Sequence, residues 1–209
     1  MSLPQMSRSG PPRMEDMLQE LRLRICATSP DTPMMLHEGK LAQEFGVSRT
    51  PIRQVLQRLS FEHLLETRSG VGTVVSTLEQ AQRDLHFSML SDMLRLCTRC
   101  CAPAYAMQSR IQIAAIGELS AHAGDMSVER YFALRAQFLN LVSGLVEDPI
   151  AAEAHAALHW RVIRWRMQAA RDNAAAAFGA LRGTVAAVAE AKTPSALLIC
   201  LAGESRETT

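Results

Sequence analysis

The chain has 209 residues, of which 48% are hydrophobic and only 5% aromatic. This length suits two domains, because single domains usually hold about 100–200 residues, and the composition favours helices over strands. The formal net charge is +1, from 22 basic and 21 acidic residues, which excludes a strong global attraction to polyanions. Any nucleic-acid contact must therefore be local.

Cysteine usage and hydropathy indicate the compartment. Three of the five cysteines crowd into CTRCC at 97–101, which is a poor framework for disulfides. No apolar run approaches the about 20 residues that a membrane span needs, and no secretory leader precedes the first helix. We therefore expect a cytoplasmic protein without membrane association.

The N-terminal stretch is expected to be a tail followed by a helix and a short strand. Residues 1–13, MSLPQMSRSGPPR, are rich in Ser, Pro and Gly and lack periodicity, which predicts disorder. From Met14 apolar residues recur at helical spacing until the breakers in TSPDTP. MML at 34–36 is then short enough for an edge strand.

Two helices separated by a tight turn are predicted next. The first spans about 38–45 and buries Phe45 with its apolar neighbours, and Gly46 suits the left-handed turn that ends it. Ser48 can cap the second helix. One stripe of this helix is apolar at i, i+3, i+4 and i+7 spacing: Ile52, Val55, Leu56 and Leu59.

A hairpin is predicted after these helices. Two β-type runs, 64–67 and 73–76, flank the turn residues Ser69, Gly70 and Gly72. Helix, helix, turn, helix and hairpin is the order of a winged helix-turn-helix. We therefore predict such a DNA-binding domain over residues 14–77.

The rest of the chain, residues 78–209, is predicted to be an all-α bundle for effector binding and dimerisation, which makes the whole protein mainly α. Turn signals thin out and the periodicity stays helical. The expected helices span about 78–108, bent near Pro103, and then 111–122, 128–146, 150–171, 174–191 and 194–202.

The segment GVSRTPIRQVLQRL at 46–59 holds three arginines and no carboxylate. A helix that reads DNA fits the major groove and needs small residues and planar donors in its first turns. Alternatively, this is an ordinary solvated helix. The candidate contacts are Ser48 and Thr50 for phosphates or capping, Arg49 and Arg53 for guanine edges or phosphates, Gln54 and Gln57 for further polar contacts, and Arg68 at the base of the wing.

These residues carry a family resemblance. Leu41, Ala42, FGVSRTPIRQVLQRL and GVGTVV resemble the N-terminal domain of GntR-family bacterial transcription regulators. The resemblance implies an operator-binding winged helix in which Ser48, Arg49, Thr50 and Arg53 match family positions that contact DNA. Gly70 matches the wing tip that enters the minor groove, and Ser69 beside it is a further candidate contact. Several relatives carry a DNA-contacting arginine where this chain has Gly39, and Lys40 beside it is the candidate substitute.

The same resemblance implies a homodimer that binds an inverted-repeat operator. Two half-sites raise affinity and specificity beyond what one small basic helix supplies. Whether binding represses or activates transcription is left open by the sequence.

The C-terminal half resembles the FCD effector domain of the fatty-acid-regulator-like branch, in degenerate form. Many such domains bind a divalent metal through one aspartate and three histidines. Here Leu139 replaces the first histidine, Ser91 stands at the aspartate position, and no histidine follows His159. We therefore predict no metal and no cofactor.

The effector candidates are Ser91, Arg95, which matches an arginine of the family pattern, and Arg135. Arg135 projects into an apolar stripe, where a guanidinium could grip the carboxylate or phosphate of a small anionic effector. The alternatives are snorkelling or an internal salt bridge to Glu129 or Asp148.

Other clusters have both a purely structural and a functional interpretation. His155 and His159 could contribute to a metal site or lie in the core. HWRVIRWRMQ at 159–168 could stack on a ligand, cover a dimer seam or form ordinary surface. Cys97, Cys100 and Cys101, placed on one helix face, could serve a redox or soft-metal sensor or be buried as small hydrophobes.

The leading hypothesis is a non-enzymatic, homodimeric transcription regulator controlled by a small molecule, with no catalytic residues. The alternative is a thiol-dependent enzyme, or a metal or redox sensor, with a DNA-binding appendage. The enzyme would need a base near the thiol, and His86, eleven residues before Cys97, is the candidate.

Overall fold

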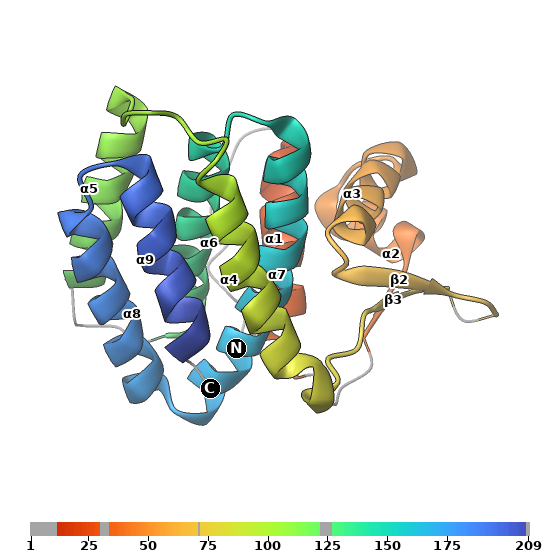
Figure 1. Ribbon diagram of the computed structural model, residues 1–209. Coiled ribbons are helices and arrows are strands. Elements are labelled where there is room, and N and C mark those ends of the chain that lie inside the picture. The colour runs from red at the N-terminus through yellow and green to blue at the C-terminus, as the bar shows by residue number, and fades with distance from the viewer. Residues whose placement is uncertain (1–11, 30–33, 71, 122–126, 208–209) are drawn as a thin grey trace. The chain divides into compact units, whose positions relative to one another are not determined.

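The computed structural model describes residues 12–29, 34–70, 72–121 and 127–207. The predicted disordered tail falls outside the described residues except for Pro12 and Arg13. The chain forms two compact units, Met1–Ser76 and Thr77–Thr209 (Figure 1). The predicted boundary, between residues 77 and 78, lies one residue away.

In the first unit the described residues form three helices and a small sheet, in the order that the sequence predicts. The elements are α1 (Met14–Ala27), β1 (Met35–Leu36), α2 (Glu38–Phe45), α3 (Arg49–Phe61), β2 (Leu65–Arg68) and β3 (Gly72–Val75). A winged helix-turn-helix fold is therefore confirmed. The helices α2 and α3 form the helix-turn-helix, and the hairpin of β2 and β3 is the wing.

Apolar stripes on α1 and α3 build the core of this unit. Leu21 and Ile25 of α1 and Ile52 and Leu59 of α3 are fully buried, as the helical spacing predicts. Gly46 ends α2 with a φ of 66°, a left-handed conformation that glycine adopts without a Cβ clash. Phe45 is half-buried, less than predicted.

A buried ion pair fixes α3 against α1. The Glu62 carboxylate, just after α3, accepts hydrogen bonds from Arg22 Nε at 3.0 Å and from Arg22 Nη2. Arg58 Nε donates to the same carboxylate at 3.1 Å. These contacts set the orientation of α3 about its own axis, and with it the direction that the polar face of α3 takes.

The sheet is antiparallel with strand order β1-β3-β2. The predicted edge strand is confirmed, and the hairpin strands lie within one residue of their predicted limits. Glycines shape the tip of the hairpin: Gly70 has a φ of +74° and Gly72 a φ of +111°. Both are left-handed conformations that a side chain would strain.

The described residues of the second unit form helices joined by short segments, which agrees with the predicted all-α bundle. They are η1 (Gln80–Gln82), α4 (Arg83–Cys97), α5 (Met107–Ala121), α6 (Val128–Leu145), α7 (Pro149–Asp172), α8 (Ala174–Glu190) and α9 (Pro194–Glu207). α9 packs between α4 and α8, and α6 packs against α5 and α7 (Figure 1).

The predicted long helix over 78–108 is wrong, because α4 already ends at Cys97. The segment after α4 is pinned to the end of α6: Ala102 N donates to Leu145 O at 2.9 Å, and Glu147 N donates to Cys100 O at 2.8 Å. Cys100 and Cys101 therefore do not continue the helix, and the three cysteines do not share one helix face. Within the described ranges, no helix is long and apolar enough to cross a membrane.

Candidate nucleic-acid interface and effector cavity

The first turns of α3 present polar side chains outward. All ten residues predicted to contact DNA lie in the first unit and are exposed: Lys40, Ser48, Arg49, Thr50, Arg53, Gln54, Gln57, Arg68, Ser69 and Gly70. The apolar stripe of α3 faces the core, so its polar face is turned to solvent. Ser48 takes the N-cap position of α3, although its side chain makes no capping hydrogen bond.

The two arginines of the first α3 turns differ in their partners. Arg53 forms a two-point ion pair with Glu38 of α2, with Nε–Oε1 at 3.2 Å and Nη2–Oε2 at 3.0 Å. The hydrogen bonds from Arg53 lower the pKa of the Glu38 carboxyl. Arg49 forms no ion pair with any described residue. Both guanidinium groups remain accessible, but Arg53 must give up or share Glu38 to bind a phosphate.

Gly39 leaves room for Arg49. A Cβ built at residue 39 would lie 3.6 Å from Arg49 Nη2, so the guanidinium rests against the backbone of α2 at this position. Lys40, the next residue, is exposed and supplies a cation near the same helix end.

The wing carries a second basic group. Arg68 at the end of β2 pairs with Glu66, with Nη2–Oε1 at 2.6 Å. Ser69 and Gly70 follow it at the exposed tip of the hairpin. A helix with an exposed cationic flank beside such a wing is the arrangement by which this fold approaches duplex DNA.

These elements define the first unit as a winged helix-turn-helix domain. Residues 14–75 match the family model described as "Bacterial regulatory proteins, gntR family". The gluconate operon transcriptional repressor of Bacillus licheniformis is 38% identical over 61 residues. That match covers 29% of this chain and spans only 25% of the length of the relative.

A solved structure resembles this chain in fold over most of its length. E. coli McbR/YncC is similar with a TM-score of 0.54 and 17% identity, covering 93% of this chain and 94% of that chain. A GntR-family transcriptional regulator from Pseudomonas syringae pv. tomato has a TM-score of 0.42 and 18% identity, covering 93% of this chain and 82% of that chain. At 17% identity the resemblance to E. coli McbR/YncC concerns the fold alone.

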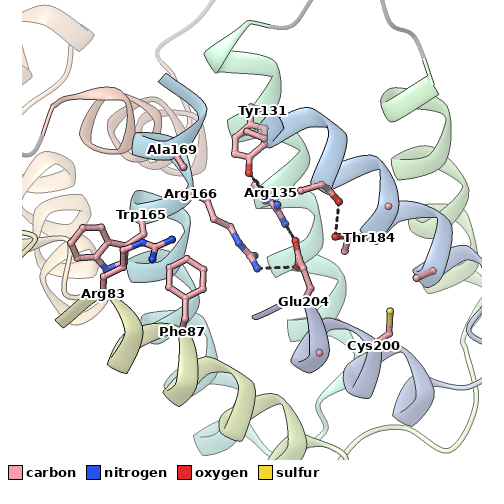
Figure 2. A pocket seen from close by; sticks show the side chains of 15 residues that line it. Arg83, Phe87, Tyr131, Arg135, Trp165, Arg166, Ala169, Thr184, Cys200 and Glu204 are labelled. Carbon is pink, nitrogen blue, oxygen red and sulfur yellow. Dashed lines mark hydrogen bonds and ion pairs between the residues drawn. The ribbon is translucent and has the colours of Figure 1, made fainter. Parts of the chain in front are cut away.

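The second unit contains a cavity of about 590 Å³. Its walls come from α4, α6, α7, α8 and α9, and Figure 2 shows the side chains that line it. The charged residues among them are Arg83, Arg135, Arg166 and Glu204. Three cations therefore face one carboxylate in a cavity large enough for a small organic molecule.

A charged cluster forms one wall of this cavity. Arg135 of α6 and Arg166 of α7 are 2% and 4% exposed, and the Glu204 carboxylate of α9 lies between them (Figure 2). Arg135 Nη1 donates to Glu204 Oε1 at 2.7 Å, and its Nε and Nη2 both donate to the Tyr131 hydroxyl at 3.1 Å. Arg166 Nη2 lies 2.9 Å from Glu204 Oε2.

The pKa shifts follow from burial and charge. Burial by itself raises the pKa of the Glu204 carboxyl, but the two guanidinium groups overcome this effect and hold its pKa at about 2. Burial and the charge of Arg135 lower the pKa of Arg166. The cluster thus keeps two buried cations on a single carboxylate, and the Arg166 cation is the less stabilised of the two.

Only one of the three predicted effector residues lies on the cavity. Arg135 lines it, but its ion-pair partner is Glu204 rather than the predicted Glu129 or Asp148. Arg95 is exposed on α4 and does not line this cavity. Ser91 is fully buried in α4 and is likewise not part of the lining.

Sequence reasoning missed Glu204 and the role of Arg166. Glu204 lies three residues after the buried Leu201, at a position where the apolar spacing of α9 continues. A carboxylate within an apolar stripe signals a buried partner, just as Arg135 does in α6. The two signals had to be read together to predict the pair.

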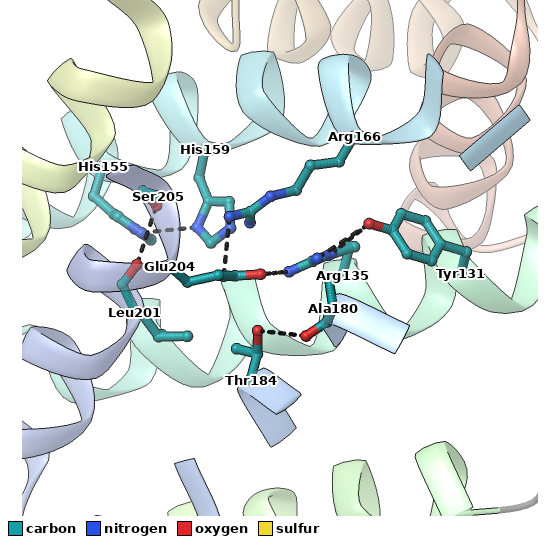
Figure 3. Close-up of polar contacts among 10 residues, drawn as sticks. All are labelled: Tyr131, Arg135, His155, His159, Arg166, Ala180, Thr184, Leu201, Glu204 and Ser205. Atoms are coloured by element: carbon teal, nitrogen blue, oxygen red, sulfur yellow. Dashed lines mark hydrogen bonds and ion pairs between the residues drawn. The ribbon is translucent and has the colours of Figure 1, made fainter. Parts of the chain in front are cut away.

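Two buried histidines lie next to this cluster (Figure 3). His155 Nε2 and His159 Nδ1 are 2.9 Å apart, so each ring is the hydrogen-bond partner of the other. No group of three or more His, Cys, Asp or Glu residues suited to a metal ion occurs among the described residues. This donor set does not fit the metal site of the FCD pattern, and the histidines are part of the core.

These histidines predict an acid-sensitive step in stability. Burial lowers the pKa of His155 from 6.5 to about 4. The free energy of unfolding is therefore unaffected by this shift above the unfolded-state pKa near 6.5. It decreases as pH falls towards 4, because the unfolded chain then binds a proton that the buried imidazole does not. We expect a loss of about 3 kcal/mol in the free energy of unfolding over this range. Urea unfolding at pH 7 and pH 4.5 measures it.

The matched variant is His155→Asn, which retains a polar side chain but does not titrate. Its free energy of unfolding should change less between these two pH values than that of the wild type. An equal change in both proteins would show that His155 is not responsible.

The cysteine-based alternative is not supported. Cys97 is fully buried, and burial raises its pKa to about 11, so the nucleophilic thiolate is scarce at neutral pH. His86 accepts a hydrogen bond from Trp165 Nε1 at 3.0 Å and is thus engaged elsewhere. The segment at 159–168 is not ordinary surface either, since Trp160 is buried against Phe132.

Proposed function

We propose that the protein is a cytoplasmic transcription regulator that binds operator DNA as a homodimer and responds to a small anionic effector. The observation that carries this proposal is the exposed cationic flank of α3, whose apolar flank is fully buried. The gntR-family domain and the repressor function of the curated relative support it. By the same analogy, we propose that DNA binding represses transcription.

Homodimerisation follows from the small size of the reading surface. One α3 helix and one wing offer few base contacts, whereas two copies related by a two-fold axis read two half-sites. The expected operator is therefore an inverted repeat with half-sites about one helical turn apart. The proposed contacts are the ten residues Lys40, Ser48, Arg49, Thr50, Arg53, Gln54, Gln57, Arg68, Ser69 and Gly70.

The cavity of the second unit is the proposed effector site. Its excess of arginines over carboxylates favours an anion, and Arg135 is the proposed contact. An effector changes DNA affinity only if it binds the two functional states with different free energies. The binding free energy of the effector would then be coupled to operator affinity.

In vitro selection tests the proposal directly. The full-length protein is used to enrich sequences from a random duplex library, and analytical ultracentrifugation measures the stoichiometry on the enriched duplex. The expected result is an inverted repeat bound by two protomers. Enrichment of no sequence at physiological salt would contradict specific DNA binding.

The Arg53–Glu38 ion pair yields a separate prediction. Glu38→Gln removes the carboxylate that competes with DNA phosphates for Arg53 and removes a negative charge near the DNA. We expect operator affinity to rise roughly two- to tenfold at low salt, with a steeper salt dependence. Fluorescence anisotropy at several salt concentrations measures both quantities.

Glu15→Gln is the matched control, because it makes the same change of charge at an exposed position on α1. An increase of equal size in both variants would indicate a general effect of charge. A decrease in Glu38→Gln would mean that the ion pair orients Arg53 for DNA binding.

A further inference from the structure

We propose that Glu204 is an internal competitor of the effector: its carboxylate occupies the position where the carboxylate of a flat, apolar organic anion binds, between Arg135 and Arg166. This inference rests on the proposed effector role of the cavity and specifies its ligand class. It also identifies the residue that the ligand must displace.

The hydrogen-bond geometry of the two arginines is the first observation. Arg135 directs three N–H groups to Tyr131 and Glu204. Arg166 Nη2 is within ion-pair distance of Glu204, but this contact lacks hydrogen-bond geometry, and no other described residue accepts a bond from that atom. A buried guanidinium nitrogen on the cavity wall thus has a donor that an incoming carboxylate can satisfy.

The charge balance is the second observation. Arg135 and Arg166 are both nearly fully buried and share one carboxylate (Figure 3). A buried cation without full compensation is costly. A ligand carboxylate that takes the place of Glu204 keeps an anion between the two guanidinium groups, and Glu204, with a side chain that is 16% exposed, is the least buried member of the cluster.

The shape of the cavity defines the rest of the ligand. The α8 wall consists mainly of residues without branched side chains, namely Ala177, Ala180, Gly183 and Ala187. Across the cavity lie the rings of Phe87 and Trp165, and the guanidinium carbons of Arg83 and Arg166 are 5.2 and 5.6 Å from the Phe87 ring centroid. A smooth apolar wall facing aromatic rings fits a planar or extended apolar body.

Displacement of Glu204 would alter the packing of α9. The Glu204 carboxylate ties α9 to α6 and α7 through the two arginines. α9 also packs along α4, and the chain leads from the DNA-binding unit through η1 directly into α4. An anion that releases Glu204 would therefore change how α9 packs on α4, which is the helix into which the chain of the DNA-binding unit leads.

The test uses 2-naphthoate as the probe and its neutral amide, 2-naphthamide, as the control ligand. Thermal melting of the full chain is recorded with increasing concentrations of each, for the wild type and for Glu204→Gln. We expect Glu204→Gln to melt at a lower temperature without ligand and to bind 2-naphthoate at least about tenfold more tightly than the wild type, because a like charge is removed. The affinities of the two proteins for 2-naphthamide should differ far less.

Two outcomes would overturn the inference. In the first, 2-naphthoate binds Glu204→Gln no more tightly than the wild type. In the second, it raises the melting temperature of neither protein.

A charge-balanced variant guards against misfolding. Arg166→Met combined with Glu204→Gln removes one charge of each sign, so it should fold, yet it should lose the gain in 2-naphthoate affinity. Alkylation provides a local readout, because Cys200 lines the cavity while Cys100 and Cys101 do not. Peptide mapping should show slower labelling of Cys200 alone when 2-naphthoate is bound. Equal affinity gains in the single and double variants would place the ligand elsewhere and overturn the inference.

Failure of this inference is separable from failure of the proposed function. If the ligand experiments succeed and operator affinity does not respond to 2-naphthoate, the competitor role of Glu204 stands and control of DNA binding through this cavity fails. If no probe binds while selection enriches an inverted repeat, DNA binding stands and the role of Glu204 is refuted.

Discussion

Replacing Arg49 with alanine is expected to abolish specific operator binding while the protein remains folded. Arg49 is exposed at the first helical position of α3 and forms no ion pair with a described residue, so its guanidinium is available to DNA. A good bidentate contact to a base is worth about 1–3 kcal/mol, and a dimer makes it twice. Affinity should therefore fall roughly 30-fold or more, as measured by anisotropy on the selected duplex.

The control for Arg49→Ala is Arg13→Ala, which removes the same charge at an exposed position at the start of α1. It should weaken binding only slightly and equally on specific and non-specific duplexes. Circular dichroism and the melting temperature should be unchanged for Arg49→Ala, because this side chain makes no core contact. A folded Arg49→Ala protein with wild-type operator affinity would refute the role of α3 as the reading helix.

Replacing Glu204 with alanine is expected to cause the largest loss of stability. The variant leaves Arg135 and Arg166 buried without their shared carboxylate. Removing one partner of a buried charge cluster typically costs about 3–5 kcal/mol, because the remaining charge is not compensated. Urea unfolding at neutral pH, followed by circular dichroism, measures this difference. Glu153→Ala, an exposed position on α7, is the control and should be nearly neutral.

The same carboxylate predicts a pH window distinct from that of the histidines. The folded-state pKa of Glu204 is about 2, below its ordinary value of 4.5. Its contribution is therefore complete above about pH 4.5 and is lost as pH falls towards 2. Wild-type stability should decline through this range, and the Glu204→Ala variant should lack that part of the decline. Parallel declines in both proteins would show that Glu204 does not carry this dependence.

The winged helix-turn-helix could be predicted almost entirely from local patterns. The i, i+3, i+4, i+7 stripe of α3, the left-handed Gly46 and the glycine-rich hairpin each depend on neighbours close in the chain. The exposed face of α3 follows from the same periodicity, since residues opposite an apolar stripe point to solvent. For this reason all the candidate DNA contacts could be chosen from the sequence.

The helix break after Cys97 could not be predicted in the same way. The residues at 98–102 include no strong helix breaker, and Pro103 is the first residue after them that predicts a bend. Hydrogen bonds from Glu147 and Ala102 connect this segment with the end of α6, more than forty positions away in the chain. A contact between distant segments ended the helix earlier than local propensity indicates.

In the cavity, too, one part could be predicted from the sequence and another part could not. Periodicity alone indicated that Arg135 faces the interior, because its neighbours in α6 are apolar at helical spacing. Its partner could not be found this way, since Glu204 lies 69 residues further along and reaches Arg135 only when α9 packs into the bundle. Helical periodicity describes which face of each helix is buried, whereas the choice of partner depends on how the helices pack. The charged cluster and the cavity beside it therefore exist only at the level of tertiary structure.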